Sequence, residues 1–512
     1  MPHAATSLTT DPLSQGIVAA VIVGLFVLLA LEKAHRVLVA LAAVAVLWGI
    51  TYLTPYDLVT LESAQASLDL NVLLLLAAMM AIVGVLKTTG VFGWAVTRLL
   101  AHANGRPHVV VRLVSWFTGL VSSVADNVTT VIFVTPMALR AARPLGVRPV
   151  VFLLPMVMAA NIGGTATLIG DPPNIMIGSG AGLTFVDFVV ALALPCVLML
   201  VLLERYAEHV FGTELAAGES AAAALGATQG ATGITAGAAT SAEEASITDP
   251  ELLRWALGIS ALVFVGFFTH GLTGMPAAIP AMIGAAALLV VQDVLYLRRH
   301  RPTEGERVHG LIAVIEREIE WPTLIFFAFL FIAVGAAVGT GLIGTAASGL
   351  AWAVHEGAAA LGLGTQGTLL FAALLVLWVS GGLSAIIDNI PFVAVTIPII
   401  AGLRTELAGD TMVLWWALSL GACLGGNGTA VGASANVTTI GLAERAGSHI
   451  SFGEFTRFGA PVTVITLLVS TGYLACYVFL GRASALVACA VVLVPAALLG
   501  RRRSPQRVVH RV

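Results

Sequence analysis

The stretch ANIGGTATLIGDPPNIMIGS, residues 160–179, decides how this chain folds. It is apolar enough to lie in a membrane, yet it carries two consecutive prolines, Pro172 and Pro173, directly after a carboxylate, Asp171. Proline lacks the amide hydrogen that a regular helix needs, and glycine permits tight turns. Irregular backbone survives at bilayer depth only where it is buried in protein or lines a watery cavity. We therefore expect a membrane span that is unwound near its middle.

The composition places the whole chain in a membrane. Of its 512 residues 58% are hydrophobic and 10% are charged, whereas soluble domains are about 25% charged. Apolar runs of about 17–25 residues recur along the sequence, which predicts an all-α polytopic membrane protein rather than a β-barrel. The expected spans are 16–31, 37–54, 71–87, a broken pair at 111–140, an interrupted span at 150–180, 186–203, 254–270, 275–296, 322–340, a broken pair at 367–402, an interrupted span at 411–440, 458–480 and 484–500.

The positions of the basic residues predict the orientation in the membrane. If the N-terminus lies outside and both broken pairs are re-entrant hairpins, all of the 25 Lys and Arg residues except Arg404 and Arg482 fall in or beside cytoplasmic segments. This asymmetry follows the positive-inside rule and supports about eleven spans with a cytoplasmic C-terminus. Two full crossings in place of each hairpin would preserve the same parity. The expected location is the bacterial inner membrane.

The chain divides into two similar halves around a polar stretch rich in Ala, Gly and Thr. We expect an extracytoplasmic tail over 1–15, a first repeat over 16–206, a flexible cytoplasmic linker over 207–249, a second repeat over 250–480, an extra helix over 481–500 and a basic cytoplasmic tail over 501–512. The linker has the composition of a flexible chain and is not expected to carry chemistry.

The halves align without gaps over two blocks. SSVADNVTTVIFVTP (122–136) matches SAIIDNIPFVAVTIP (384–398), and NIGGTATLIGDPPN (161–174) matches CLGGNGTAVGASAN (423–436), both at an offset of 262 residues. Upstream, GVLKTTGVFG from Gly84 matches GAAVGTGLIG from Gly335 at an offset of 251. The charge pattern orients the two halves oppositely in the membrane. Inverted repeats with interrupted helices predict a secondary transporter with a binding site near the midplane.

Each repeat offers two interruptions for a substrate or ion site. Carboxylates at bilayer depth are functional candidates, and unwound backbone exposes carbonyls that can coordinate a cation. The candidates at the hairpin tips are Asp126, Asn127, Asp388 and Asn389, preceded by Ser122 and Ser384; those at the breaks are Gly163, Gly164, Thr167, Asn174, Gly425, Gly426, Asn427, Thr429 and Asn436. Asp171 is a weaker candidate because Ala433 stands at its equivalent position.

Structural roles compete with these assignments. Asp126 and Asp388 are also placed to cap the second helix of each hairpin, and capping and ion binding can coexist. The serines, threonines and asparagines are equally suited to satisfy helical or frayed backbone groups. The candidate metal is sodium at Asp126, Asn127, Asp388 and Asn389; otherwise the coupling ion is a proton, and no cofactor is expected. The chain lacks a GxxxxGK[ST] loop, which argues against an ATP-driven pump.

These motifs resemble the ion transporter superfamily, and within it the arsenite-permease and P-protein (pink-eyed-dilution) branch. The similarity lies in ANIGGTATLIGDPPNIMIGS, GLSAIIDNIPF and GACLGGNGTAVGASANVTTIGLAERAG, and covers roughly residues 16–480 without the linker. It implies a scaffold domain and a transport domain, a homodimer and an elevator movement. It also leaves an ATPase subunit as a further partner, but no nucleic acid. Related divalent-anion/sodium symporters read Ser-Asn-Thr at the tips, so the Asp-Asn tips here favour proton coupling.

We therefore expect an ion-coupled secondary transporter, not an enzyme, that moves a small inorganic anion or metalloid such as arsenite or antimonite. The alternatives are a sodium/proton antiporter that uses the same carboxylates, a citrate or dicarboxylate symporter, and a channel-like anion conductance. No Lys or Arg lies within either motif, so a multiply charged anion would depend on helix dipoles, backbone amides and bound cations.

Overall fold

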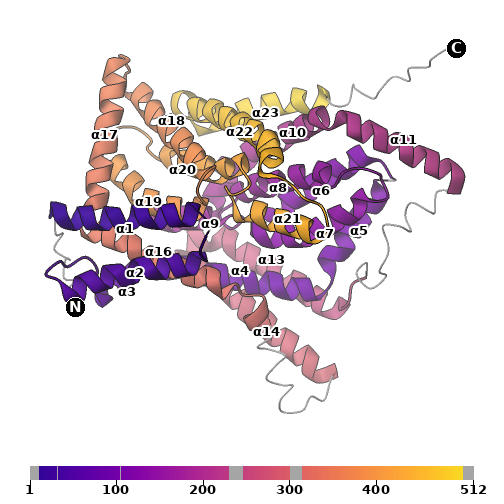
Figure 1. Ribbon diagram of the computed structural model, residues 1–512, viewed down its shortest axis with the longest axis horizontal. Helices are drawn as coiled ribbons and strands as arrows, with labels where there is room; N and C mark the ends of the chain where they lie inside the picture. Colours follow the sequence, from indigo (N-terminus) through magenta and orange to yellow (C-terminus); the bar gives the residue numbers. More distant parts are fainter. Residues whose placement is uncertain (1–10, 32, 104, 230–245, 300–313, 500–512) are drawn as a thin grey trace.

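The regular secondary structure in the described part of this protein is entirely helical. The computed structural model describes residues 11–31, 33–103, 105–229, 246–299 and 314–499, and every regular element within these ranges is a helix (Figure 1). Nine helices there are long and apolar enough to span a membrane: α1 (Pro12–Ala30), α2 (Arg36–Leu53), α4 (Leu70–Thr88), α10 (Phe185–Val210), α13 (Pro250–Thr273), α14 (Ala278–Arg299), α16 (Trp321–Gly339), α18 (Thr365–Ser384) and α22 (Phe452–Leu480). The predicted polytopic membrane fold is confirmed.

Shorter helices form the broken elements of each half. The first hairpin consists of α6 (Pro107–Ser122) and α7 (Asn127–Ala142), and the first interrupted span of α8 (Val150–Thr165) and α9 (Pro172–Ala181). In the second half, α18 pairs with α19 (Asn389–Glu406), while α20 (Val413–Gly425), a short 3₁₀ turn and α21 (Ser434–Arg445) form the interrupted span. The last helix, α23, covers Arg482–Leu499. The hairpin tip and the interrupted span predicted for each half are therefore present at the predicted positions.

The two halves repeat individual contacts as well as helices. The Thr167 hydroxyl donates to the Ser123 carbonyl at 2.5 Å, and Thr429, 262 residues later, donates to the Ala385 carbonyl at the same distance. At the smaller offset of 251 residues, Gly90 and Gly341 both precede a helix with φ of 75° and 77°. Figure 1 shows the helices that these glycines begin, α5 (Val91–His102) and α17 (Leu342–Ala360), at opposite ends of the molecule. This placement fits an inverted repeat.

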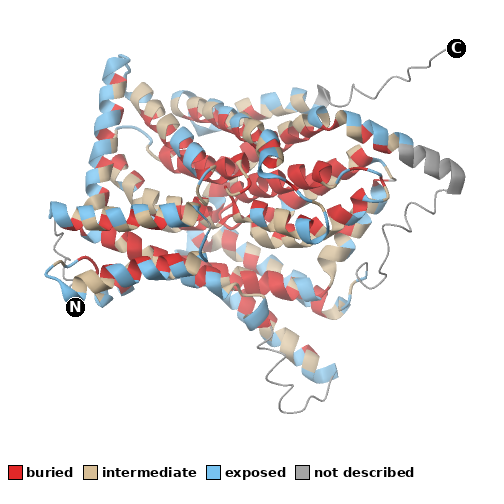
Figure 2. Cartoon of the chain, in the orientation of Figure 1, coloured by how far each residue is buried: buried red, intermediate tan, exposed pale blue. Residues whose placement is uncertain are grey.

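The interrupted spans lie at the centre of the protein. Every residue of α8 and of α20 is buried, and Figure 2 shows the buried colour concentrated there. A helix that is hydrophobic on all sides is typical of such a position. The hairpin helices α6 and α18 pack directly on α8 and α20, where a Cβ on Gly163 or Gly425 would overlap the backbone of Gly119 or Gly381. Glycine is therefore required at this close approach.

The prolines of the GDPPN motif have a different role from the one expected. Pro172 and Pro173 do not lie within the unwound segment; they occupy the first turn of α9, directly after the break. The first amides of a helix have no intrahelical acceptor, so proline is tolerated there and favours a helix start. The unwound residues between α8 and α9 precede these prolines.

Part of the predicted flexible linker, 207–249, is helical. After α10 ends at Val210, α11 covers Gly212–Gln229. This helix is docked on the bundle: Leu215 is buried, and Glu214 pairs with Arg148 at 2.6 Å. The composition of the stretch is rich in alanine, which favours a helix as much as a loop once a surface is available for docking. Residues 230–245 of the linker, most of the N-terminal tail and the basic tail lie outside the described residues.

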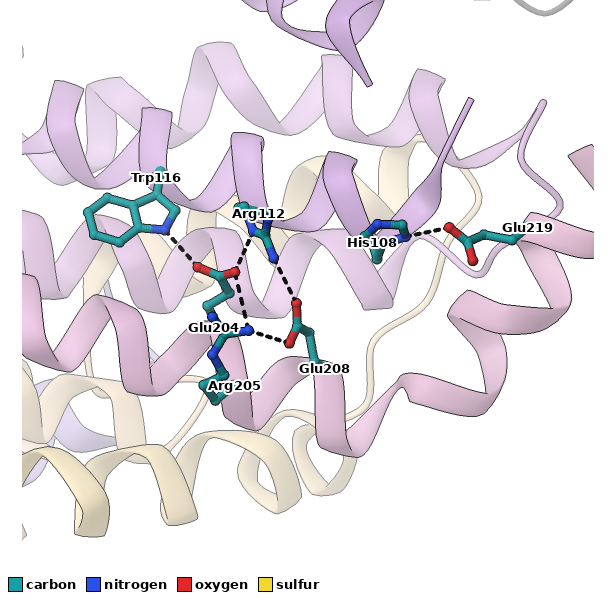
Figure 3. Close-up of polar contacts among 7 residues, drawn as sticks. All are labelled: His108, Arg112, Trp116, Glu204, Arg205, Glu208 and Glu219. Atoms are coloured by element: carbon teal, nitrogen blue, oxygen red, sulfur yellow. Dashed lines mark hydrogen bonds and ion pairs between the residues drawn. The ribbon is translucent and has the colours of Figure 1, made fainter. Parts of the chain in front are cut away.

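Helices α10 and α11 are tied to the first hairpin by ion pairs (Figure 3). Glu204 on α10 is buried, and its carboxylate accepts hydrogen bonds from the Arg112 guanidinium and, at 2.9 Å, from the Trp116 indole on α6. His108 on α6 pairs with Glu219 on α11. A buried carboxylate is costly without such partners, so this network fixes α6 against α10.

Candidate functional site

The first hairpin tip holds its carboxylate by local hydrogen bonds. Asp126 caps α7, where it accepts a hydrogen bond from the Thr129 amide at 2.9 Å and another from the Thr129 hydroxyl. The predicted capping role is therefore present. Asp126 is half-buried and also lines a cavity of about 470 Å³, so capping does not withdraw it from solvent-accessible space.

The second tip binds its carboxylate differently. Asp388 caps α19 through a longer hydrogen bond of 3.3 Å from the Ile390 amide. Its other oxygen accepts a hydrogen bond from the Ser434 hydroxyl on α21 at 3.1 Å. Pro391 occupies the position equivalent to Thr129, so the amide and hydroxyl donors that Thr129 offers to Asp126 have no counterpart here. Asp388 consequently depends on partners from other helices.

Both tips meet at the same cavity. Asp126, Asn127, Asp388 and Asn389 all line it, and so does Asp171 at the start of α9. The two halves of the sequence thus converge on one space, as an inverted repeat with a central site requires. In Figure 1, α9 lies near the centre of the view.

The remaining predicted residues lie behind this cavity rather than on its surface. Asn174 donates from Nδ2 to the carbonyls of Thr165 and Thr167 at 3.1 and 2.9 Å, and Asn436 donates to those of Gly426 and Thr429 at 2.8 and 2.9 Å. These carbonyls of the breaks, expected to be exposed for a cation, each accept an amide hydrogen. The cavity lining lacks Ser122, Ser384, Gly163, Gly164, Thr167, Asn174, Gly425, Gly426, Asn427, Thr429 and Asn436.

A chain of buried asparagines connects the two halves. Asn161 accepts a hydrogen bond from Asn127 at 3.1 Å and donates from Nδ2 to Asn427 at 2.8 Å and to Asn436 at 3.2 Å. The sequence interpretation missed Asn161 as a site residue. Its equivalent in the second repeat is Cys423, so the comparison of the halves gave no matching pair. The network links the first tip directly to the second break.

Two charged residues of the cavity come from outside the repeat motifs. Arg36 at the start of α2 donates to the Thr323 hydroxyl at 2.7 Å and to the Ser434 hydroxyl at 3.3 Å, and lies 4.0 Å from Asp388. Glu320 precedes α16 and accepts from Thr323 at 2.9 Å. Both residues are found beside predicted spans, where the sequence alone indicates an interfacial position. Their approach to the tips is a consequence of tertiary packing.

The charge of the cavity is predominantly negative. Four carboxylates line it, from Asp126, Asp171, Glu320 and Asp388, and among the described lining residues the only Lys or Arg is Arg36, with His35 beside it. Within the described part of the chain no three His, Cys, Asp or Glu side chains converge as metal ligands. The cavity lining therefore carries more negative than positive side chains.

Comparison with known proteins is consistent with this geometry. The model of the citrate transporter family matches residues 26–421. An uncharacterised transporter of Mycobacterium tuberculosis H37Rv is 37% identical over 456 residues, which cover 89% of this chain and 96% of that protein. The human P protein is 30% identical over 519 residues, which cover 90% of this chain but 59% of the P protein.

A solved structure shares the fold. The crystal structure of the Alcanivorax borkumensis YdaH transporter aligns with a TM-score of 0.50 over 92% of this chain and 99% of that chain. The sequence identity is 16%, so this likeness concerns the arrangement of helices alone.

Proposed function

Because this chain belongs to the citrate transporter family, we propose that it is a proton-coupled secondary transporter whose solute and coupling ion bind in the cavity lined by the carboxylates of Asp126 and Asp388. Its relatives are transporters and not enzymes, and its resemblance to the P-protein branch of the ion transporter superfamily is confirmed. The single observation that carries the proposal is that two carboxylates, one from each inverted half, line one cavity. Ionisable groups inside a membrane protein commonly mark proton and ion pathways.

The charge of the cavity guides the choice of solute. A free trianion such as citrate would enter a space lined by four carboxylates and one arginine, where like charges repel. Arsenite and antimonite are uncharged hydroxides near neutral pH and bring no such repulsion. Their hydroxyl groups can exchange hydrogen bonds with the asparagine and aspartate side chains of the tips. We therefore place a small metalloid hydroxide first among the solutes.

Citrate accompanied by a cation is the second candidate. The description of the matching family favours it, and Arg36 supplies one fixed positive charge that the sequence motifs lack. A bound cation would neutralise the remaining charge of the solute. This candidate predicts uptake that requires both citrate and a cation.

The proposed orientation and movement follow from the same residues. His35, Arg36 and Glu320 lie at helix ends that the positive-inside rule assigns to the cytoplasm, and all three line the cavity. The cavity would then open inward, with the N-terminus outside. We propose that an elevator movement of the two tips and breaks carries this cavity to the other side, and that the protein forms a homodimer.

A reconstitution screen tests the proposed function. Purified protein in liposomes is supplied separately with arsenite, citrate or sodium ions, each with and without an imposed pH gradient. We expect uptake of arsenite that accelerates with the gradient and is absent from protein-free liposomes. Citrate uptake would favour the second candidate, and sodium-driven proton movement without either solute would favour an antiporter. Flux that is indifferent to any second ion gradient would contradict coupled transport.

A further inference from the structure

The two interrupted spans differ at two paired positions, where their helices resume after the break, although their backbones repeat. Asp171 and Ala433 both precede a helix in extended conformation, with φ of −142° and −148°. The first half therefore has a carboxylate where the second has a methyl group. At the next position the first half has Pro172 and the second has Ser434, whose hydroxyl binds Asp388. The first half therefore has an additional negative charge at Asp171, and the second half has an additional hydrogen-bond donor at Ser434.

A fixed positive charge lies beside the second tip. Arg36 lies 4.0 Å from Asp388 and shares Ser434 with it as a hydrogen-bonding partner. The guanidinium is fixed from the other side by Thr323 at 2.7 Å and lies over the Phe326 ring at 5.7 Å. Arg36 thus stays beside the second tip without any ligand.

The first tip has no corresponding arginine or lysine among the cavity residues that the structure describes. Asp126 is held by Thr129 of its own helix, whereas Asp171 is 1% exposed and its Oδ2 atom has no hydrogen-bond partner within the described residues. A buried carboxylate oxygen without a partner is costly unless a ligand satisfies it. Because Asp171 lines the cavity, such a ligand can reach it from there.

We propose that Arg36 is a built-in counter-cation for Asp388, and that the mobile cation, a proton or a sodium ion, binds in the first half at Asp171 beside Asp126. This assignment rests on the proposed coupled transport and gives the two tips different tasks. The carboxylate of Asp388 remains paired with Arg36, and the cavity takes up one external cation rather than two. Arg36 therefore positions the Asp388 carboxylate and balances its charge, whereas Asp171 binds the mobile cation.

A charge-pair cycle tests this division. Arg36→Gln, Asp388→Asn and their double variant are compared in liposomes, with arsenite and citrate as solutes, driven either by a pH gradient in sodium-free buffer or by a sodium gradient at equal pH. Each single variant leaves one charge without its partner, and we expect uptake to fall at least about 100-fold. The double variant removes both charges together and should recover to within about 10-fold of the wild type.

The matched control is Arg36→Gln combined with Asp171→Asn, which should not recover, because Asp171 is not the partner of Arg36. Equal recovery in both double variants, or none in the Arg36→Gln/Asp388→Asn protein, would overturn the proposal. The thermal unfolding midpoint in detergent provides a second measurement that does not require transport. There the Arg36→Gln/Asp388→Asn protein should unfold above both single variants, and a midpoint at or below theirs would reject the pairing. Absence of uptake by the wild type would contradict the proposed function instead.

Discussion

Replacing Asn161 with alanine should destabilise the centre of the protein. The Asn161 side chain is fully buried and takes part in three hydrogen bonds, one from Asn127 and two to Asn427 and Asn436. Alanine removes all three and leaves an amide group of each partner without that contact. Because Asn127 lies on the cavity, the loss also frees the first tip to reorient.

The size of the effect follows from hydrogen bonds measured inside membrane proteins. Such bonds contribute about 0.6 kcal/mol on average and about 1.7 kcal/mol at most. Three bonds lost at one residue therefore predict a decrease of about 2–5 kcal/mol in the free energy of unfolding. Values near the upper end apply if no water enters to replace the amide, since an unsatisfied buried group costs more than a lost bond.

The assay is unfolding of purified protein in detergent, followed by tryptophan fluorescence and by the fraction that remains monodisperse after heating. Cys423→Ala is the matched control, because it alters the equivalent position of the second repeat. The hydrogen bond from the Cys423 thiol to Asn174 Oδ1 is weak, at 3.5 Å, and a thiol is a poor donor, so its loss should cost less than about 1 kcal/mol. Equal stability of the Asn161→Ala and Cys423→Ala proteins would refute the reasoning.

Three further predictions concern the packing, the buried ion pair and a helix cap. Gly425→Ala would place a methyl group against the Gly381 carbonyl and should cost about 1–3 kcal/mol in unfolding measurements, whereas Gly441→Ala, where a Cβ meets open space, should cost nothing. Glu204→Ala leaves the Trp116 indole without its acceptor and Arg112 with Glu208 alone, and should cost about 1–3 kcal/mol, against less than about 1 kcal/mol for the more exposed Glu208→Ala. Asp249 caps α13, where its side chain accepts hydrogen bonds from backbone amides. Partial burial raises the pKa of Asp249, but the hydrogen bonds from Arg299 and from the Leu252 amide outweigh this effect, so the pKa lies below its ordinary value. Stability from this cap is present above the unfolded pKa and is lost as the pH falls through the folded one; Asp249→Asn should flatten that acid decrease, and an unchanged stability profile between about pH 5 and pH 2 would contradict the assignment.

The repeat and its interruptions could be predicted because they depend on residues that are close together in the sequence. A span needs a long apolar run, and a break needs glycines; both signals occur within one segment and recur at a fixed offset. The offset of 262 residues predicts pairs of contacts such as Thr167 with Ser123 and Thr429 with Ala385. The acidic tips were predicted for the same reason, since a carboxylate in an apolar run is conspicuous.

The residues that were missed act through tertiary packing. Arg36 and Glu320 belong to helix ends that lie far from the tips in sequence, and only the arrangement of α2 and α16 brings them to the cavity. The helix α17 escaped prediction because its alanine, glycine and polar residues give no long apolar run. The hydrogen bonds at the break carbonyls could not be predicted, because a sequence shows where a helix unwinds but not that Asn174 and Asn436 bind the carbonyls freed there.

The most direct test of the account is proton-coupled uptake by the Asp126→Asn and Asp388→Asn proteins in liposomes, with the solute that the wild type transports. Both variants keep the shape of the side chain and remove its charge. We predict that each remains folded and monodisperse while gradient-driven uptake falls at least about 100-fold. Uptake at the wild-type rate in both variants, with an unchanged response to the pH gradient, would contradict the claim that coupled transport requires the carboxylates of both tips.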